Sequence, residues 1–238
     1  MTATLTLGDV TVDVLQKDIK HLHLTVHPPD GRVRIAAPLR MKIETIRVYA
    51  ITKLAWIRQQ QRKLRLQERV APREYIDRES HYVWGRRCLL KVLEVDAAPA
   101  VEQRHSRMTL RVRTGASREQ KQAVLAQWYR DQVKAAISAL ISTWEQRLGV
   151  TVERVFVQAM RTKWGSCNPA ARNIRLNTDL AKKPAECLEY VLVHELVHLL
   201  EPTHDAHFVS LMDRHLPDWV HRRQMLNRLP VRHEDWDY

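Results

Sequence analysis

Two histidines and a glutamate form the most chemically specific group of residues in this chain of 238 residues. The stretch VLVHELVHLLEPTH covers residues 191–204, and in it His194 and His198 stand four positions apart. On a helix this spacing places both imidazoles on one face, about one turn from each other. Neutral imidazole is a good zinc ligand, and Glu195 would lie beside the metal, where it can take a proton from a zinc-bound water. The spacing therefore predicts a metal site that performs hydrolysis.

The residues around this motif predict that its helix is buried. Residues 191–200 are apolar on nearly every side of a helix, which is typical of a helix inside a core. We expect this helix to begin at Pro184 and to run to about Leu200. Polar side chains without partners are costly in a dry interior, and a metal ion would give these histidines a partner.

A catalytic zinc site usually takes three protein ligands and a water molecule, so the motif needs a third ligand. His204 is the best candidate by spacing, because Pro202 ends the helix near Glu201 and the turn that follows can bring His204 back towards the metal. On the residues alone, His207, Glu201 and Asp205 stay open as alternatives. Asp205 is better explained as the N-cap of the next helix.

The polar stretch between two expected strands, residues 161–172, is the candidate wall of the substrate pocket. Trp164, Gly165 and Ser166 could place backbone N–H groups near a developing oxyanion. They could equally form a structural turn that needs Gly165, with Trp164 filling the core. Arg161 and Lys163 could bind an anionic group of a substrate, although solvated loop charges are the simpler interpretation.

At these residues the chain resembles the YgjP-like metallopeptidases, relatives of the SprT and WLM families within the zincin fold. The resemblance is carried by Lys163-Trp164-Gly165-Ser166-Cys167, Asn173-Ile174-Arg175-Leu176-Asn177, Tyr190, His194-Glu195-Leu196-Val197-His198, His204, Phe208 and Leu216-Pro217-Asp218. It is most specific over residues 158–229 and covers most of the chain more loosely. It implies that His194, His198 and His204 are zinc ligands and that Glu195 is the catalytic base.

The chain departs from the family pattern at three positions near the motif. Val197, Thr203 and Val209 stand where the family often has Cys, Asn and Trp. None of these departures removes an implied ligand or the base.

Apolar periodicity predicts the elements that position the motif. Residues 21–27 and 32–36 alternate around a turn and predict a hairpin, and residues 42–69 recur with helical spacing. Residues 80–95 and 107–114 predict a second hairpin, and residues 117–148 predict a long helix with a capping box at its start. Two further strands are expected over residues 154–160 and 173–178.

These elements predict an α+β fold with two parts. We expect a zincin-like catalytic domain with the HExxH helix over residues 116–238. A β-rich N-terminal region with one helix would precede it over residues 1–115. The apolar and charged fractions, 45% and 28%, are those of an ordinary globular protein.

Charge and cysteine content indicate the compartment and the partners. The formal net charge is +12 and the pI is about 10.0, so the surface could attract nucleic acid or another polyanion, although a solvated basic surface is the simpler interpretation. Three widely spaced cysteines do not predict a disulfide framework. With no apolar stretch long enough for a membrane span and no basic, apolar leader pattern, we expect a cytoplasmic protein that does not contact a membrane.

The function expected from the sequence is that of a zinc-dependent metallohydrolase, most simply a metallopeptidase acting on peptides or proteins. It would hold one zinc ion, with other divalent metals left open. One alternative is a metal-dependent nucleotide pyrophosphohydrolase, although the sequence has no Gly-rich phosphate loop. A second is a DNA-associated SprT-like protease or a zinc-containing nucleic-acid-binding protein, although no recognised nucleic-acid-binding motif is present.

Overall fold

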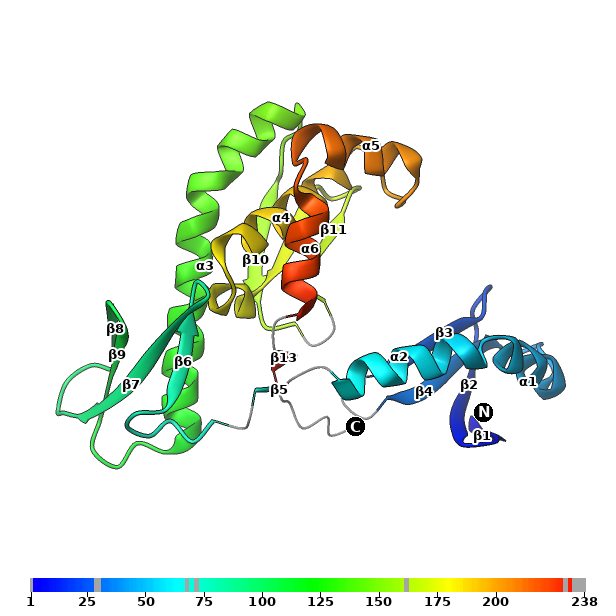
Figure 1. The fold of residues 1–238 in the computed structure, drawn as a ribbon, viewed down its shortest axis with the longest axis horizontal. Coiled ribbons are helices and arrows are strands. Elements are labelled where there is room, and N and C mark those ends of the chain that lie inside the picture. Colours follow the sequence, from blue (N-terminus) through cyan, green and yellow to red (C-terminus); the bar gives the residue numbers. More distant parts are fainter. Residues whose placement is uncertain are drawn as a thin grey trace. The chain divides into compact units, whose positions relative to one another are not determined.

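A computed structural model describes residues 2–27, 31–66, 69–70, 73–160, 163–228 and 231–232. The chain divides into two compact units, Met1–Pro72 with Pro230–Tyr238, and Arg73–Leu229 (Figure 1). The expected boundary near residue 115 falls inside the second unit, where strands give way to a long helix. No helix in the described part of the chain is long and apolar enough to cross a membrane.

The first unit is a four-stranded sheet covered by two helices. The strands are β1 (Thr2–Leu7), β2 (Val10–Lys17), β3 (His23–His27) and β4 (Arg32–Pro38), in the order β1-β2-β4-β3. Strands β3 and β4 are antiparallel, which confirms the first predicted hairpin. A core forms where alternate side chains of β1, β2 and β4 meet those of the helices, as in Val12, Ile35 and Ile57. A short parallel pair, β5 (Arg69–Val70) with β13 (Val231–Arg232), belongs to the same unit.

The helix predicted over residues 42–69 is two helices, α1 (Ile43–Thr52) and α2 (Leu54–Leu66). The helical conformation is lost at Lys53, with φ −101° and ψ 2°. Just before the break, the Thr52 hydroxyl donates a hydrogen bond to the carbonyl of Tyr49 at 2.7 Å. Such side-chain bonds compete with the helical pattern and give a physical reason for the interruption.

The second unit begins with another four-stranded sheet. Its strands are β6 (Ser80–Val83), β7 (Arg86–Glu94), β8 (Ala100–Arg104) and β9 (Arg107–Val112), in the order β6-β7-β9-β8. The prediction that residues 80–95 and 107–114 pair as one hairpin is wrong, because β7 and β9 are parallel and each closes a tight hairpin of its own. The turn between β6 and β7 uses Trp84 at φ 47° and Gly85 at φ 77°, and the turn between β8 and β9 uses His105 at φ 53°.

The two four-stranded sheets have the same order and the same strand directions. In each sheet the two central strands, β2 with β4 and β7 with β9, are parallel to each other. Each outer strand is antiparallel to the central strand beside it. The sequence shows no internal repeat, so this likeness is visible only in the pairing.

The long helix α3 (Arg118–Leu148) confirms the helix predicted over residues 117–148. Ser117 and Gln120 form the expected capping box, and Gly149 ends the helix in the left-handed conformation at φ 66°. The buried face of α3 includes Val133, Ile137 and Trp144, which pack into the core of the second unit.

The rest of the second unit is a three-stranded sheet followed by helices. The elements are β10 (Arg154–Gln158), β11 (Gly165–Asn168), β12 (Asn173–Asn177), η1 (Thr178–Lys182), α4 (Ala185–Val197), α5 (Ala206–His215) and α6 (Trp219–Arg228). The strands expected over residues 154–160 and 173–178 are confirmed as β10 and β12. The stretch expected to be a loop contains the strand β11, antiparallel to β12, so Gly165 and Ser166 belong to a sheet. Gly and Asn have low strand propensity, which hid this short strand.

Candidate metal centre

The end of α4 carries the first two histidines. His194 and Glu195 lie inside the helix, and His198 follows Val197 in a nearly helical conformation with φ −64° and ψ −15°. The imidazole rings of His194 and His198 have centroids 4.9 Å apart. The helix ends three residues earlier than expected, and the backbone has left it before Pro202.

His204 joins the two helix histidines from the segment between α4 and α5. Its Nε2 lies 3.0 Å from Nε2 of His194, and one ring nitrogen from each of His194, His198 and His204 lies within 4.8 Å of the others. Among the described residues, these three histidines are the group that could hold a metal ion.

Two of the three alternatives for a third ligand, Asp205 and Glu201, accept hydrogen bonds elsewhere, and the third, His207, is not part of the group that could hold a metal ion. Asp205 caps α5 by accepting hydrogen bonds from the backbone N–H groups of His207 and Phe208, which confirms its predicted capping role. The Glu201 carboxylate accepts a hydrogen bond from the Thr203 hydroxyl at 2.9 Å. The cap also fixes the backbone next to His204, because Asp205 is its neighbour in the chain.

Phe208 forms the floor beneath the three imidazoles. Its ring centroid lies 5.0, 4.8 and 4.7 Å from those of His194, His198 and His204, respectively. The side chain is almost fully buried, at 2% exposure. A rigid aromatic ring in this position restricts the rotation of all three imidazoles.

The surroundings keep the histidines of α4 neutral. Burial, together with the nearby His198 and His204, lowers the pKa of His194 to about 3. Burial also lowers the pKa of His198, whose Nδ1 lies 3.0 Å from the carbonyl oxygen of Glu201. A carbonyl accepts, so Nδ1 of His198 carries the proton and Nε2 keeps a free lone pair, as metal binding requires.

Glu195 is a buried carboxyl group next to this cluster. Its exposed fraction is 6%, and burial raises its pKa to about 7. Lys163 and the backbone N–H of Cys167, which donates a hydrogen bond to the carboxylate, act in the opposite direction. A carboxyl group with a pKa near neutrality can both accept and release a proton.

Gly165 allows β11 to approach α4 closely. A Cβ atom at Gly165 would lie 2.7 Å from Oε1 of Glu195 and 2.8 Å from Cγ1 of Val191. Any larger residue would therefore displace Glu195 or the strand. The sequence pattern identified Gly165 as a candidate pocket residue. A glycine is needed there because the strand contacts Glu195 closely, and not because the chain turns.

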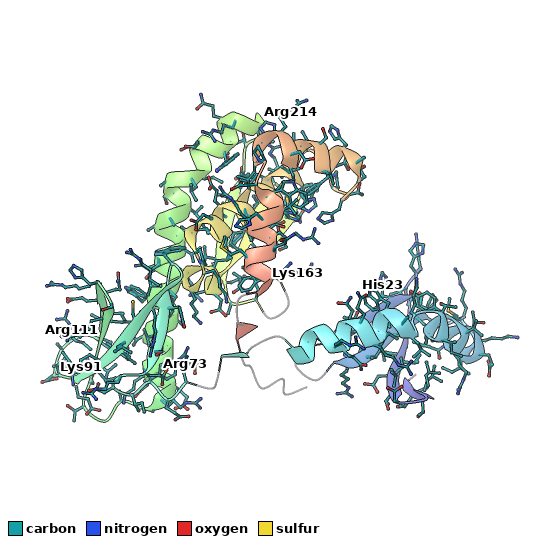
Figure 2. The ribbon with its side chains drawn as sticks, in the orientation of Figure 1. His23, Arg73, Lys91, Arg111, Lys163 and Arg214 are labelled. Atoms are coloured by element: carbon teal, nitrogen blue, oxygen red, sulfur yellow. The ribbon has the colours of Figure 1, made fainter. Side chains whose placement is uncertain are left out.

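A cleft of about 230 Å³ opens beside Glu195. It is lined by Lys163, Trp164, Gly165, Tyr190, Val191, His194, Glu195, Arg223, Leu226 and Asn227. Of the predicted pocket residues, Lys163, Trp164 and Gly165 line it, and Figure 2 labels Lys163. Ser166 lies in β11 and is not among the lining residues, and Arg161 lies outside the described residues.

Sequence reasoning did not identify the contribution of α6 to this cleft. Arg223, Leu226 and Asn227 follow Glu195 by about 30 residues, and no local pattern indicates that they return to it. Their spacing of three and four positions could have shown that they share a helix face, but not which site that face meets.

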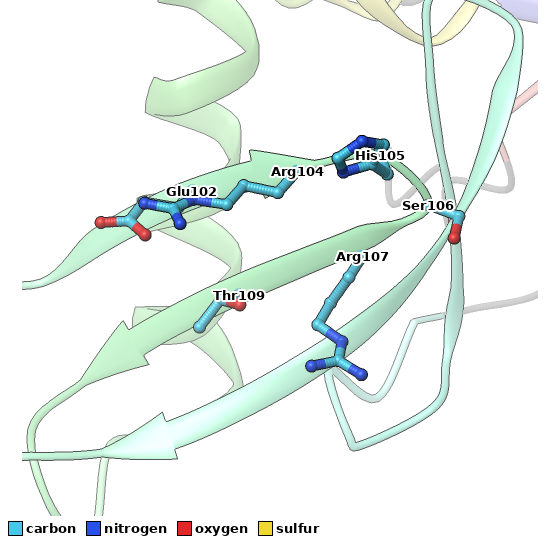
Figure 3. A pocket seen from close by; sticks show the side chains of 6 residues that line it. All are labelled: Glu102, Arg104, His105, Ser106, Arg107 and Thr109. Atoms are coloured by element: carbon cyan, nitrogen blue, oxygen red, sulfur yellow. The ribbon is translucent and has the colours of Figure 1, made fainter.

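A larger hollow of about 510 Å³ lies on the β8–β9 hairpin (Figure 3). Its lining residues are Glu102, Arg104, His105, Ser106, Arg107 and Thr109. Glu102 is ion-paired with Arg111, and His105 is the one imidazole in the lining. The hollow therefore lacks the set of ligands found at the end of α4.

Three imidazoles that meet beside a buried carboxyl group are typical of metal-dependent hydrolases. A protein-family model described as "YgjP-like, metallopeptidase domain" matches residues 20–229. The chain therefore belongs to the YgjP-like metallopeptidase family, as its sequence resemblance predicted. Membership of a metallopeptidase family implies a divalent metal ion.

Two solved structures are similar to part of the chain. One is the metallopeptidase zymogen abylysin of Pyrococcus abyssi, 22% identical with a TM-score of 0.35, covering 40% of this chain and 99% of that one. The other is the metallopeptidase zymogen jannalysin of Methanocaldococcus jannaschii, 16% identical with a TM-score of 0.33, covering 40% of this chain and 92% of that one. No curated protein matches the chain.

Proposed function

We propose that this protein is a zinc-dependent peptidase in which His194, His198 and His204 hold the metal and Glu195 is the general base. The observation that carries the proposal is the convergence of three ring nitrogens within 4.8 Å, next to a carboxyl group that is 6% exposed. Two ligands of one tetrahedral zinc ion lie about 3.3 Å apart, close to the 3.0 Å between Nε2 of His194 and Nε2 of His204.

The donor set fits zinc better than a hard cation. Three neutral imidazoles suit zinc, whereas magnesium and calcium prefer oxygen ligands. Three protein ligands also leave a coordination position open, as catalytic sites require. Bound zinc would supply Lewis-acid activation of a water molecule and of the scissile carbonyl.

The chain's own residues would manage the proton. Glu195 would take a proton from the attacking water and later deliver it to the leaving nitrogen, for which a pKa of about 7 is well suited. The Cys167 N–H bond to the carboxylate would hold it in place. The strand β11 is at the edge of its sheet, so an extended peptide could pair with it beside Glu195.

Side-by-side assays of wild type and Glu195→Gln test this proposal. Each protein is loaded with zinc, its metal content is measured by elemental analysis, and it is incubated with reduced, unfolded casein and separately with ATP. We expect one zinc ion in both proteins, cleavage of casein by the wild type, and a rate about 10²–10⁴-fold lower in Glu195→Gln.

The same experiment distinguishes the alternatives. Casein cleavage by Glu195→Gln at the wild-type rate would disprove the role of Glu195. Hydrolysis of ATP without cleavage of casein would favour phosphoanhydride chemistry over peptide chemistry. A third protein, His204→Ala, is added to the elemental analysis, and full zinc content in it would show that His204 is not a ligand.

A further inference from the structure

The cleft beside Glu195 has basic side chains on two of its walls. Its floor is α4, through Tyr190 and Glu195. Lys163, just before β11, lines one wall, and Arg223 of α6 lines another. The cleft therefore takes its charge from segments that are far apart in the sequence.

The orientation of α6 is fixed by the residue that precedes Arg223. Nη1 of Arg222 lies 2.5 Å from Oε2 of Glu189 on α4, and its Nε donates to Asp218 at 2.9 Å. The Arg222 side chain is 14% exposed and that of Glu189 is 27% exposed, so this ion pair is partly shielded from solvent. This ion pair fixes the rotation of α6 about its own axis relative to α4. As a result, Arg223 lies on the face of α6 that lines the cleft.

Arg223 and Lys163 are the positively charged residues in the lining of the cleft. Both residues are exposed, and neither forms an ion pair with any carboxylate in the described ranges of the chain. Glu195 is the one acidic residue in the lining of the cleft, against these two basic residues.

We propose that the cleft selects peptides that carry a carboxylate close to the scissile bond, and that Arg223 and Lys163 bind this group. The inference rests on the proposed peptidase function and adds the class of substrate. The carboxylate could belong to an aspartate or glutamate side chain or to the C-terminus of the peptide. Both sources offer two oxygens to a guanidinium and an ammonium group, the strongest kind of hydrogen bond in proteins.

The test begins with the cleavage of a complex peptide mixture by the zinc-loaded full chain. Mass spectrometry of the products gives the preferred residue at each position around the cut. Matched fluorogenic peptides are then made with Glu, Gln or Lys at the most selective position, each with a free and an amidated C-terminus. We expect kcat/KM to be about tenfold higher for Glu than for Gln, and lower still for Lys.

Variants of Arg223 assign the preference to this residue. Arg223→Gln should reduce the difference between the Glu and Gln peptides, because only Lys163 then binds the carboxylate, and Arg223→Glu should make the Lys peptide the better substrate. Ratios of kcat/KM within one variant do not depend on how much of that variant is folded. Arg214→Glu makes the same charge change on α5 outside the cleft lining, and Arg214 is well separated from Lys163 in Figure 2, so its ratios should match the wild type.

The outcomes separate this inference from the proposed function. If only amidation of the C-terminus lowers kcat/KM, the carboxylate is the terminal one, and the inference holds for that source. Equal cleavage of all peptides, or a wild-type Glu preference in Arg223→Glu, would overturn the inference and leave the peptidase function intact. Cleavage of no peptide by zinc-loaded protein would overturn the proposed function, and this inference with it.

Discussion

Replacement of Gly165 by alanine should impair catalysis without removing the metal. The added Cβ would lie 2.7 Å from Oε1 of Glu195 and 2.9 Å from its Cγ, while ordinary contacts begin at 3.4 Å. The carboxylate must therefore retreat by about 0.7 Å, the difference between 3.4 and 2.7 Å. A misplacement of about 1 Å costs about 100-fold in rate, so we expect kcat/KM to fall about 30- to 100-fold.

The assay for Gly165→Ala combines kinetics, elemental analysis and thermal unfolding. Crowding against Val191, whose Cγ1 would lie 2.8 Å from the new atom, should destabilise the fold by about 1–3 kcal/mol. A second substitution, Val191→Ala, removes that contact and should restore part of the stability. It should not restore the rate, because the clash with Glu195 remains. Ser166→Ala is the control in the same strand and should behave like the wild type.

Two results would refute this reasoning. Wild-type kcat/KM and stability in Gly165→Ala would show that β11 shifts without loss of stability and that Glu195 is not displaced. Loss of zinc together with activity would show that the metal ligands, and not the carboxylate, are disturbed.

Two further predictions concern the residues that support the site. Asp205→Ala removes the N-cap of α5 next to His204, so it should cost about 1 kcal/mol of stability and weaken zinc binding in a competition titration, while Asp205→Asn, also a good cap, should retain most of both. Tight zinc binding by Asp205→Ala would show that the cap does not position His204. Burial lowers the pKa of Lys183 to about 8 from 10.5, so the unfolded state holds more protons between these pH values and the free energy of unfolding should rise by about 3 kcal/mol across that range. Denaturant titrations should show this rise in the wild type relative to Lys183→Met, and an identical pH dependence in the two proteins would contradict it.

The parts of the site that could be predicted from the sequence are those set by local geometry. A spacing of four positions on a helix places His194 and His198 together whatever the rest of the fold does. The proline at position 202 excluded a helix that continues to His204, and although α4 already ends at Val197, His204 does return to the motif over the few residues that follow. The capping role of Asp205 is equally local, since its partners are the next residues along the chain.

The parts that could not be predicted depend on pairing between distant segments. The alternation of apolar side chains in residues 80–112 does not show that β7 and β9 pair in parallel, and the turn at Gly85 is marked in the sequence by a single glycine. The place of Arg223 in the cleft depends on the packing of α6 against α4. Gly165 was identified as a residue of interest, but its neighbour Glu195 is 30 positions away, and no sequence pattern records such a contact.

In the proposed enzyme, one part of α4 would bind the metal and another part would fix the helix that orients the substrate. Its C-terminal end supplies His194 and Glu195, and the segment from there to Asp205 carries the other two histidines of the candidate metal site. One turn earlier, Glu189 accepts a hydrogen bond from Nε1 of Trp144 on α3 at 3.1 Å and pairs with Arg222 on α6. This single carboxylate thus fixes both the helix behind α4 and the helix that carries Arg223. If the proposed function and substrate class are correct, changes on α6 should alter which peptide is cleaved while the three imidazoles and Glu195 stay in place.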